Sequence, residues 1–156
     1  MTFTLPSIVS SKYLGTVADF RATKMDRSGA QRNEYFTATI PISTLTGVYV
    51  GLVPFNKGWK LSYGSKFYIA NVGDGSFTFD LGYLYYDSAT GSSQDQAFGT
   101  AITTGQAGGL ITFDENAGLS WTALGDGWIV LKTGGSTTDA AGVIEGQAVG
   151  SYDTGA

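Results

Sequence analysis

The sequence predicts an all-β fold, an antiparallel two-sheet sandwich with an eight-stranded jelly roll as the expected topology. From Tyr35 onward, apolar and polar residues alternate with a period of two, which is typical of strands that bury one face. Turn-forming residues separate these stretches at regular spacing, and Gly alone occurs 23 times in the 156 residues. Both observations favour many short strands over helices.

Residues 1–33 lack this period, and we expect them to form an extended N-terminal arm with one short strand near residues 15–22. The arm has five basic residues and two acidic ones, which gives +3, whereas residues 34–156 carry −7, so the net charge is −4. This asymmetry predicts that the arm contacts an acidic partner surface or a neighbouring copy of the chain. The residues expected to make that contact are Lys12, Arg21, Lys24, Arg27 and Arg32.

Residues 34–156 are expected to form the sandwich domain itself. Strands are expected at residues 35–42, 48–53, 59–69, 77–85, 98–104, 109–114, 128–133 and 143–152. The clearest is 59–69, where Trp59, Leu61, Tyr63, Phe67 and Ile69 share one face. Residues 115–124 are compatible with a single helical turn.

The stretch at residues 46–55 is apolar on both faces, and the stretch at 77–85 is rich in aromatic residues. Aromatic side chains are enriched where subunits meet. We therefore expect these strands to form an interface between copies of the chain. The residues assigned to that interface are Tyr49, Val53, Phe55, Tyr83 and Tyr85.

The composition argues against catalysis. The chain has no His and no Cys, which excludes thiol nucleophiles, Ser–His–Asp arrangements and the usual zinc sites. Carboxylate pairs drawn from Asp80 and Asp87 leave glycoside hydrolysis as the remaining catalytic alternative, and turn aspartates such as Asp95 and Asp126 leave a calcium site. Solvated turn carboxylates are the preferred interpretation, so we expect no enzyme, no cofactor and no bound metal.

Nucleic acid and membranes are not expected partners. The acidic body would repel phosphate, and five basic residues spread over the arm are too sparse for a dedicated phosphate-binding tail. No apolar run approaches the ~20 residues of a membrane helix, and the N-terminal residues do not resemble a signal peptide.

The order of several segments is informative. TGVYVGLVPFNKGWKLSYGSKFYI at 46–69 is followed by GSFTFDLGYLYYD at 75–87, GWIVLKTGGS at 127–136 and AGVIEGQAVGSYD at 141–153. Pro54 and Gly58 precede the long strand, a Thr-Gly-Gly turn at 133–135 precedes the closing strand, and Tyr152 ends it. This order resembles small jelly-roll virion proteins of tailed bacteriophages, in particular capsid decoration (cement) proteins.

The resemblance implies a non-catalytic structural protein, often a homotrimer, on the outer capsid surface of a virion assembled in the bacterial host cytoplasm. Its partners would be the major capsid protein and further copies of itself, and it would staple capsomer junctions. Two alternatives stay open: a carbohydrate- or receptor-binding β-sandwich of a phage tail or tail tip, and a structural protein of the tail or neck.

Overall fold

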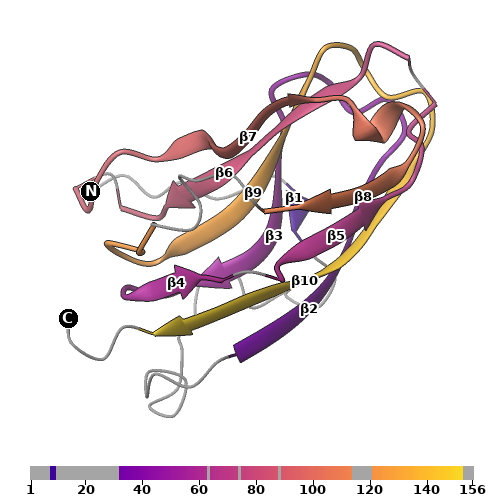
Figure 1. The fold of residues 1–156 in the computed structure, drawn as a ribbon. Coiled ribbons are helices and arrows are strands. Elements are labelled where there is room, and N and C mark those ends of the chain that lie inside the picture. Colours follow the sequence, from indigo (N-terminus) through magenta and orange to yellow (C-terminus); the bar gives the residue numbers. More distant parts are fainter. Residues whose placement is uncertain are drawn as a thin grey trace.

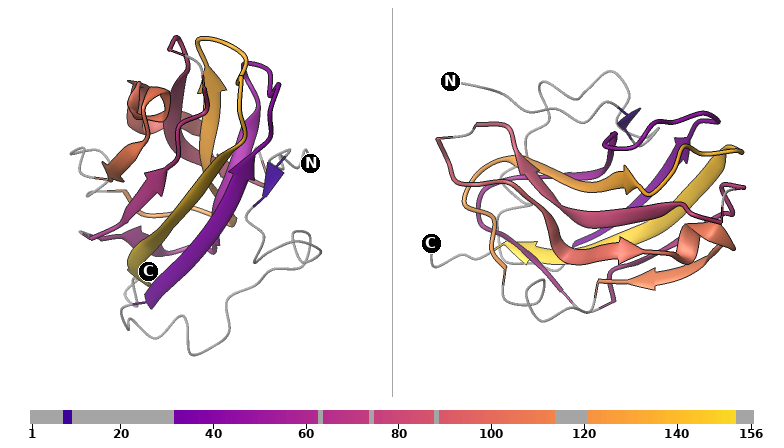
Figure 2. Two further views of the ribbon diagram at one scale, coloured as in Figure 1. Left: turned by 90° about the vertical axis from the view of Figure 1, so that its right-hand side faces the viewer. Right: turned by 90° about the horizontal axis from the view of Figure 1, so that it is seen from above.

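The computed structural model describes residues 8–9, 32–62, 64–73, 75–87, 89–113 and 121–152. It confirms the all-β fold: two sheets face each other across a shared core (Figures 1 and 2). The strands are β1 (Ile8–Val9), β2 (Arg32–Ile40), β3 (Tyr49–Phe55), β4 (Trp59–Leu61), β5 (Lys66–Ile69), β6 (Thr78–Tyr85), β7 (Gln94–Ile102), β8 (Gly109–Thr112), β9 (Gly127–Gly134) and β10 (Gly142–Tyr152).

The strand order is that of a jelly roll. One sheet runs β1-β3-β9-β6-β7 and the other β2-β10-β5-β8, with β4 also paired to β10. From β2 to β10, the chain passes to the opposite sheet at every connection except β4–β5 and the β6–β7 hairpin. The pairs are antiparallel apart from β1, which runs parallel to β3. The expected eight strands are therefore recovered if β4 and β5 are counted as one interrupted strand.

The alternating pattern places side chains as expected. In β2, Phe36, Ala38 and Ile40 are buried, whereas the alternate residues Tyr35, Thr37 and Thr39 are exposed. The continuous apolar run of β9 has a different cause. This strand lies inside its sheet, between β3 and β6, and both its faces are buried from Trp128 to Leu131.

The expectation of one continuous strand over 59–69 is wrong for the residues at its centre. It divides into β4 and β5, and Gly64 between them has φ +95°. Residues other than Gly rarely adopt this backbone conformation. Gly64 therefore permits the chain to leave the strand and to pair again with β10.

Other expectations need correction. Ile42 was expected to continue the first strand, but β2 ends at Ile40, before Pro41, which has no N–H to donate to a sheet. The helical turn expected at 115–124 is absent from residues 121–124, and 114–120 lie outside the described residues. Within the described residues, the one helical element is a 3₁₀ turn at Thr104–Gln106.

The arm adds a strand that the sequence did not predict. Ile8 and Val9 pair with Val50 and Gly51 of β3. The strand expected at 15–22 lies outside the described residues, as does most of the arm. Arg32 belongs to β2, so the sandwich begins within the segment that was assigned to the arm.

Candidate functional site: the outer surfaces of the sandwich

The described residues show no constellation for metal binding. No group of three or more Asp and Glu side chains among them could hold an ion. The Asp80 carboxylate accepts hydrogen bonds from the Gln96 amide, the Thr100 hydroxyl and the Ala101 N–H at 2.8–3.2 Å. Asp126 accepts from the Lys57 N–H at 2.9 Å, and Asp87 from the Ala89 N–H at 2.9 Å. These carboxylates thus bind backbone and side-chain donors of neighbouring turns and strands.

No helix in the described part of the chain could cross a membrane, because its one helical turn has three residues. The remaining candidate surfaces are the outer faces of the two sheets and the loops at their ends.

The residues assigned to a subunit interface lie mostly inside one chain. Val53, Phe55, Tyr83 and Tyr85 are buried, with at most 7% of their surface exposed. Phe55 packs edge-on against Tyr85, with ring centroids 6.0 Å apart, and Tyr83 stacks on Trp121 at 4.7 Å. These four side chains belong to the core of the sandwich and expose little surface to a second copy. The subunit interface itself stays a prediction.

Tyr49, the fifth of these residues, lies on the outer face of its sheet. Its hydroxyl donates to Asp95 Oδ2 at 2.8 Å, and Lys132 Nζ donates to the same oxygen at 2.9 Å. Lys132 Nζ also lies 5.6 Å from the centre of the Tyr49 ring, within cation–π range. The three side chains tie β3, β7 and β9 together across the sheet.

This cluster changes the acidity of its members. The hydrogen bond from Lys132, opposed by partial burial, holds the pKa of Asp95 below its ordinary value of 3.8. The same bond raises the pKa of Lys132 above 10.5, and burial together with the Asp95 bond raises the pKa of Tyr49 above 10.0. At neutral pH the Asp95 carboxylate and the Lys132 ammonium thus form an ion pair, and the Tyr49 hydroxyl donates to the same carboxylate.

Part of this outer face is buried. Trp128, Val130 and Leu84 form a second buried cluster there, and Tyr49 and Tyr86 pack against it. Burial raises the pKa of Tyr86 to about 12. This buried outer face explains why the β9 run is apolar on both sides.

A loop at one end of the sandwich presents apolar side chains to solvent. Residues 41–48 connect β2 to β3, at the end opposite the C-terminus of β10 (Figure 1). Ile42 is 62% exposed and Leu45 65% exposed. We call these two residues the apolar tip.

Two buried threonines hold this loop rigidly. The Thr138 hydroxyl accepts from the Thr44 N–H at 3.0 Å and donates to the Pro41 carbonyl at 2.8 Å. The Thr133 hydroxyl donates to the Leu45 carbonyl at 2.7 Å and accepts from the Val48 N–H at 3.0 Å. The tip is therefore an apolar projection whose loop backbone is tied to two buried hydroxyls.

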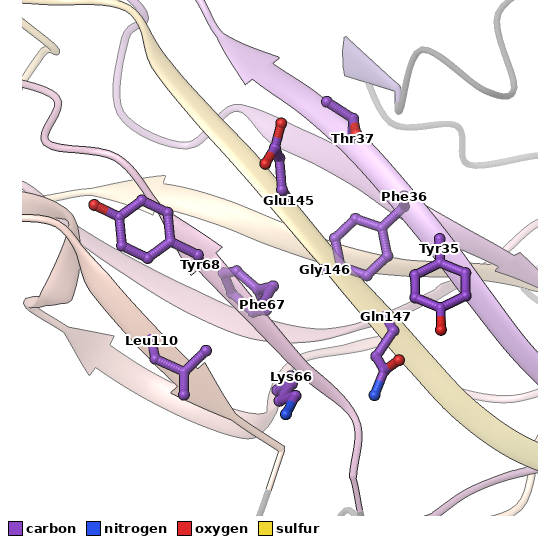
Figure 3. A pocket seen from close by; sticks show the side chains of 10 residues that line it. All are labelled: Tyr35, Phe36, Thr37, Lys66, Phe67, Tyr68, Leu110, Glu145, Gly146 and Gln147. Carbon is purple, nitrogen blue, oxygen red and sulfur yellow. The ribbon is translucent and has the colours of Figure 1, made fainter.

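The second sheet carries an open outer face. Tyr35, Tyr68 and Leu110 are 65%, 51% and 62% exposed there, and Val143 on β10 is 40% exposed. A shallow hollow of about 510 Å³ lies among β2, β10, β5 and β8. Figure 3 shows the rings of Tyr35 and Tyr68 on opposite sides of β10, from which Glu145 and Gln147 project between them. We call this hollow the β10 groove.

The basic residues expected to bind a partner cannot be placed. Lys12, Arg21, Lys24 and Arg27 lie outside the described residues, and Arg32 is located only by its backbone in β2. Their role stays a prediction.

Sequence reasoning missed both the apolar tip and the groove. The groove had a usable signal, because alternation assigns Tyr35 to the solvent side of its strand, where a large aromatic residue is unexpected. The tip had none, since its rigidity depends on threonines about ninety residues away.

Comparisons with known proteins bear on the fold. No protein-family model matches the chain, and no curated protein matches its sequence. Its structure is similar to a chain of the cyanophage Pam1 capsid asymmetric unit, with a TM-score of 0.59 and 15% identity, over 87% of this chain and 96% of that one. It is also similar to a chain from the capsid of Ralstonia phage GP4, with a TM-score of 0.55 and 15% identity, over 82% and 90%. The chain thus shares its fold with chains of two bacteriophage capsids, which confirms, at the level of the fold, its resemblance to phage virion proteins.

Proposed function

We propose that this chain is a virion structural protein, a decoration or cement protein that binds the outer surface of a bacteriophage shell and stabilises capsomer junctions. The observation that carries the proposal is the fold likeness to chains of two phage capsids, which extends over more than four fifths of this chain in both comparisons. The absence of His and Cys from the sequence supports a role in contact rather than catalysis.

The apolar tip supports a shell contact. Ile42 and Leu45 project from a loop that buried hydroxyls fix at both ends, so docking them costs little conformational entropy. The major capsid protein is the proposed partner of this tip.

The arm supplies the second proposed contact. Its charge of +3 opposes the −7 of the body, so it suits an acidic shell surface or the body of a neighbouring copy. A homotrimer would present three tips and three arms, and linked contacts of modest strength raise the overall affinity by about 10²–10⁴.

Removal of the gene from the phage tests the proposal. Particles without the chain should still assemble, but they should release their genome at a lower temperature than complete particles. Addition of the purified chain should restore the original temperature. The proposal is contradicted if particles fail to assemble, or if they keep full heat stability and do not bind added chain.

The tail alternative gives a different result in the same experiment. A carbohydrate- or receptor-binding sandwich of a tail tip would leave head stability unchanged and reduce adsorption to host cells. The two measurements, heat release and adsorption, therefore separate the two functions.

A further inference from the structure

We infer that the β10 groove is a binding site for a neutral oligosaccharide. The groove crosses four strands, and its side chains form two rows set by strand register. One row is Tyr35, Gln147, Lys66 and Thr112, and the other is Thr37, Glu145, Tyr68 and Leu110. Each row combines aromatic or apolar side chains with hydrogen-bonding ones, and a sugar ring likewise presents both C–H groups and hydroxyls.

The two tyrosines supply the stacking surfaces. Tyr35 and Tyr68 are more than half exposed, although each has a large apolar ring. A tyrosine ring offers its apolar face to the C–H side of a sugar, and its hydroxyl can still bond to a sugar hydroxyl or to water. Neither ring packs against another aromatic ring in the described part of the chain.

The polar groups between the rings have unused hydrogen-bonding capacity. Within the described residues, the side chains of Lys66, Glu145, Tyr35 and Tyr68 make no hydrogen bond or ion pair with the protein. Gln147 is the exception, because its Nε2 donates to the Gly64 carbonyl at 3.2 Å. A carboxylate accepts, an ammonium donates and a phenol does both, so the set matches the mixed donors and acceptors of a polyol.

Charge and dimensions narrow the ligand class. Glu145 and Lys66 balance each other, which favours a neutral glycan over a phosphorylated or acidic one. Strand spacing of about 4.8 Å and a rise of about 3.4 Å per residue place the Cα atoms of Tyr35 and Tyr68 about 12 Å apart, roughly the length of three linked sugars.

The same features disfavour a protein partner on this face. A stable protein interface buries about 800 Å² per partner around a dry, apolar centre. Here two polar side chains, Glu145 and Gln147, interrupt the apolar surface between the two tyrosines (Figure 3). A protein bound over the groove would have to remove water from the Glu145 carboxylate and the Lys66 ammonium, and this desolvation costs free energy unless the partner supplies matching charges.

The test is an NMR titration of the full-length, ¹⁵N-labelled chain with cellotetraose, maltotetraose and chitotetraose. We expect at least one of them to bind with a Kd on the order of 1 mM or tighter. Shift changes should be confined to β2, β5, β8 and β10. The Tyr35→Ala and Tyr68→Ala variants should each weaken binding at least tenfold, whereas Leu124→Ala, an equally exposed control away from the groove, should not.

The inference is overturned if none of the three sugars shifts these resonances, or if both tyrosine variants bind as the wild type does. If the tyrosine variants lose particle binding while the wild-type chain binds no sugar, the face contacts the shell instead. That outcome would overturn the glycan site and leave the proposed decoration function intact, since the two are measured separately. Spectra of the free variants should match the wild type outside the groove, which shows that they fold.

Discussion

The indole ring of Trp59 lies against the backbone of Gly150, so closely that a Cβ at position 150 would come within 2.4 Å of Trp59 Cε2. Four residues earlier, a Cβ on Gly146 would come within 2.3 Å of Phe67 Cβ. The two glycines of β10 thus make room for large side chains from β4 and β5, the two halves of the interrupted strand. Gly in this strand serves packing rather than turning.

We predict that Gly150→Ala lowers the free energy of unfolding by about 1–3 kcal/mol, because the methyl group overpacks the core beside Trp59. Denaturant unfolding followed by tryptophan fluorescence measures the change. Gly75→Ala is the matched control, since its Cβ would meet nothing within 4 Å. Equal stability of the two variants would show that the close packing of Trp59 on Gly150 is not real.

The loop that carries the apolar tip depends on Thr138, which is 1% exposed. Thr138→Val keeps the shape of the side chain but leaves the Thr44 N–H without its acceptor, so stability should fall by about 1–3 kcal/mol. Thr39→Val, on the exposed face of β2, should change stability by less than about 0.5 kcal/mol. Hydrogen exchange of the Thr44 amide checks the mechanism: it should quicken in Thr138→Val alone, and unchanged exchange would contradict it.

Asp95 gives the fold a specific pH dependence. Because Lys132 lowers its pKa in the folded state, the carboxylate stabilises the fold above its ordinary pKa of 3.8. That contribution is lost as the pH falls through the lower, folded value. Asp95→Asn should therefore cost less than about 1 kcal/mol at pH 7, since the pair is partly exposed.

The difference between Asp95→Asn and the wild type should shrink as the pH falls below 3.8, in unfolding curves recorded from pH 7 to pH 2. Asp139→Asn, at an exposed carboxylate on a loop, is the control and should follow the wild type. A constant gap between Asp95→Asn and the wild type across this range would rule out the ion pair as the cause.

The apolar tip predicts a separation of binding from stability. Ile42→Asp and Leu45→Asp should leave the free energy of unfolding within about 0.5 kcal/mol of wild type, because both side chains already face solvent. Each should weaken binding to particles that lack the chain at least tenfold, measured by co-sedimentation. Leu124→Asp, 60% exposed at the other end of the sandwich, should bind normally. If all three variants bind equally well, the tip is not the shell contact.

The sequence was a good guide to the core of the sandwich. Alternation over residues 35–40 and 77–85 predicted which side chains point inward, because burial of one face imposes a period of two on a strand. It could not say which aromatic residues face a partner. Tyr83 and Tyr85 were assigned to a subunit interface, yet their side chains point to the inner face of the strand and lie with Phe55 in the core.

The remaining differences have local or long-range causes. A strand of two residues, such as Ile8–Val9, is too short to show any period. The break at Gly64 is a single positive φ inside an otherwise regular pattern. The tip arises from contacts between segments distant in the sequence, which no local pattern records. The groove had one local signal, the outward side of Tyr35, but its assembly from four strands could not be read from the sequence. The charge difference between the arm (+3) and the body (−7) predicted that the arm contacts an acidic surface or a neighbouring copy, and the described residues do not test that prediction.

The central claim is that this chain decorates the outside of a phage shell, and cryo-electron microscopy of intact particles tests it most directly. Particles with and without the gene should differ by a jelly-roll density on the outer surface at capsomer junctions, with the Ile42–Leu45 loop facing the shell. A difference density inside the shell or on the tail, or no difference at all, would contradict the account.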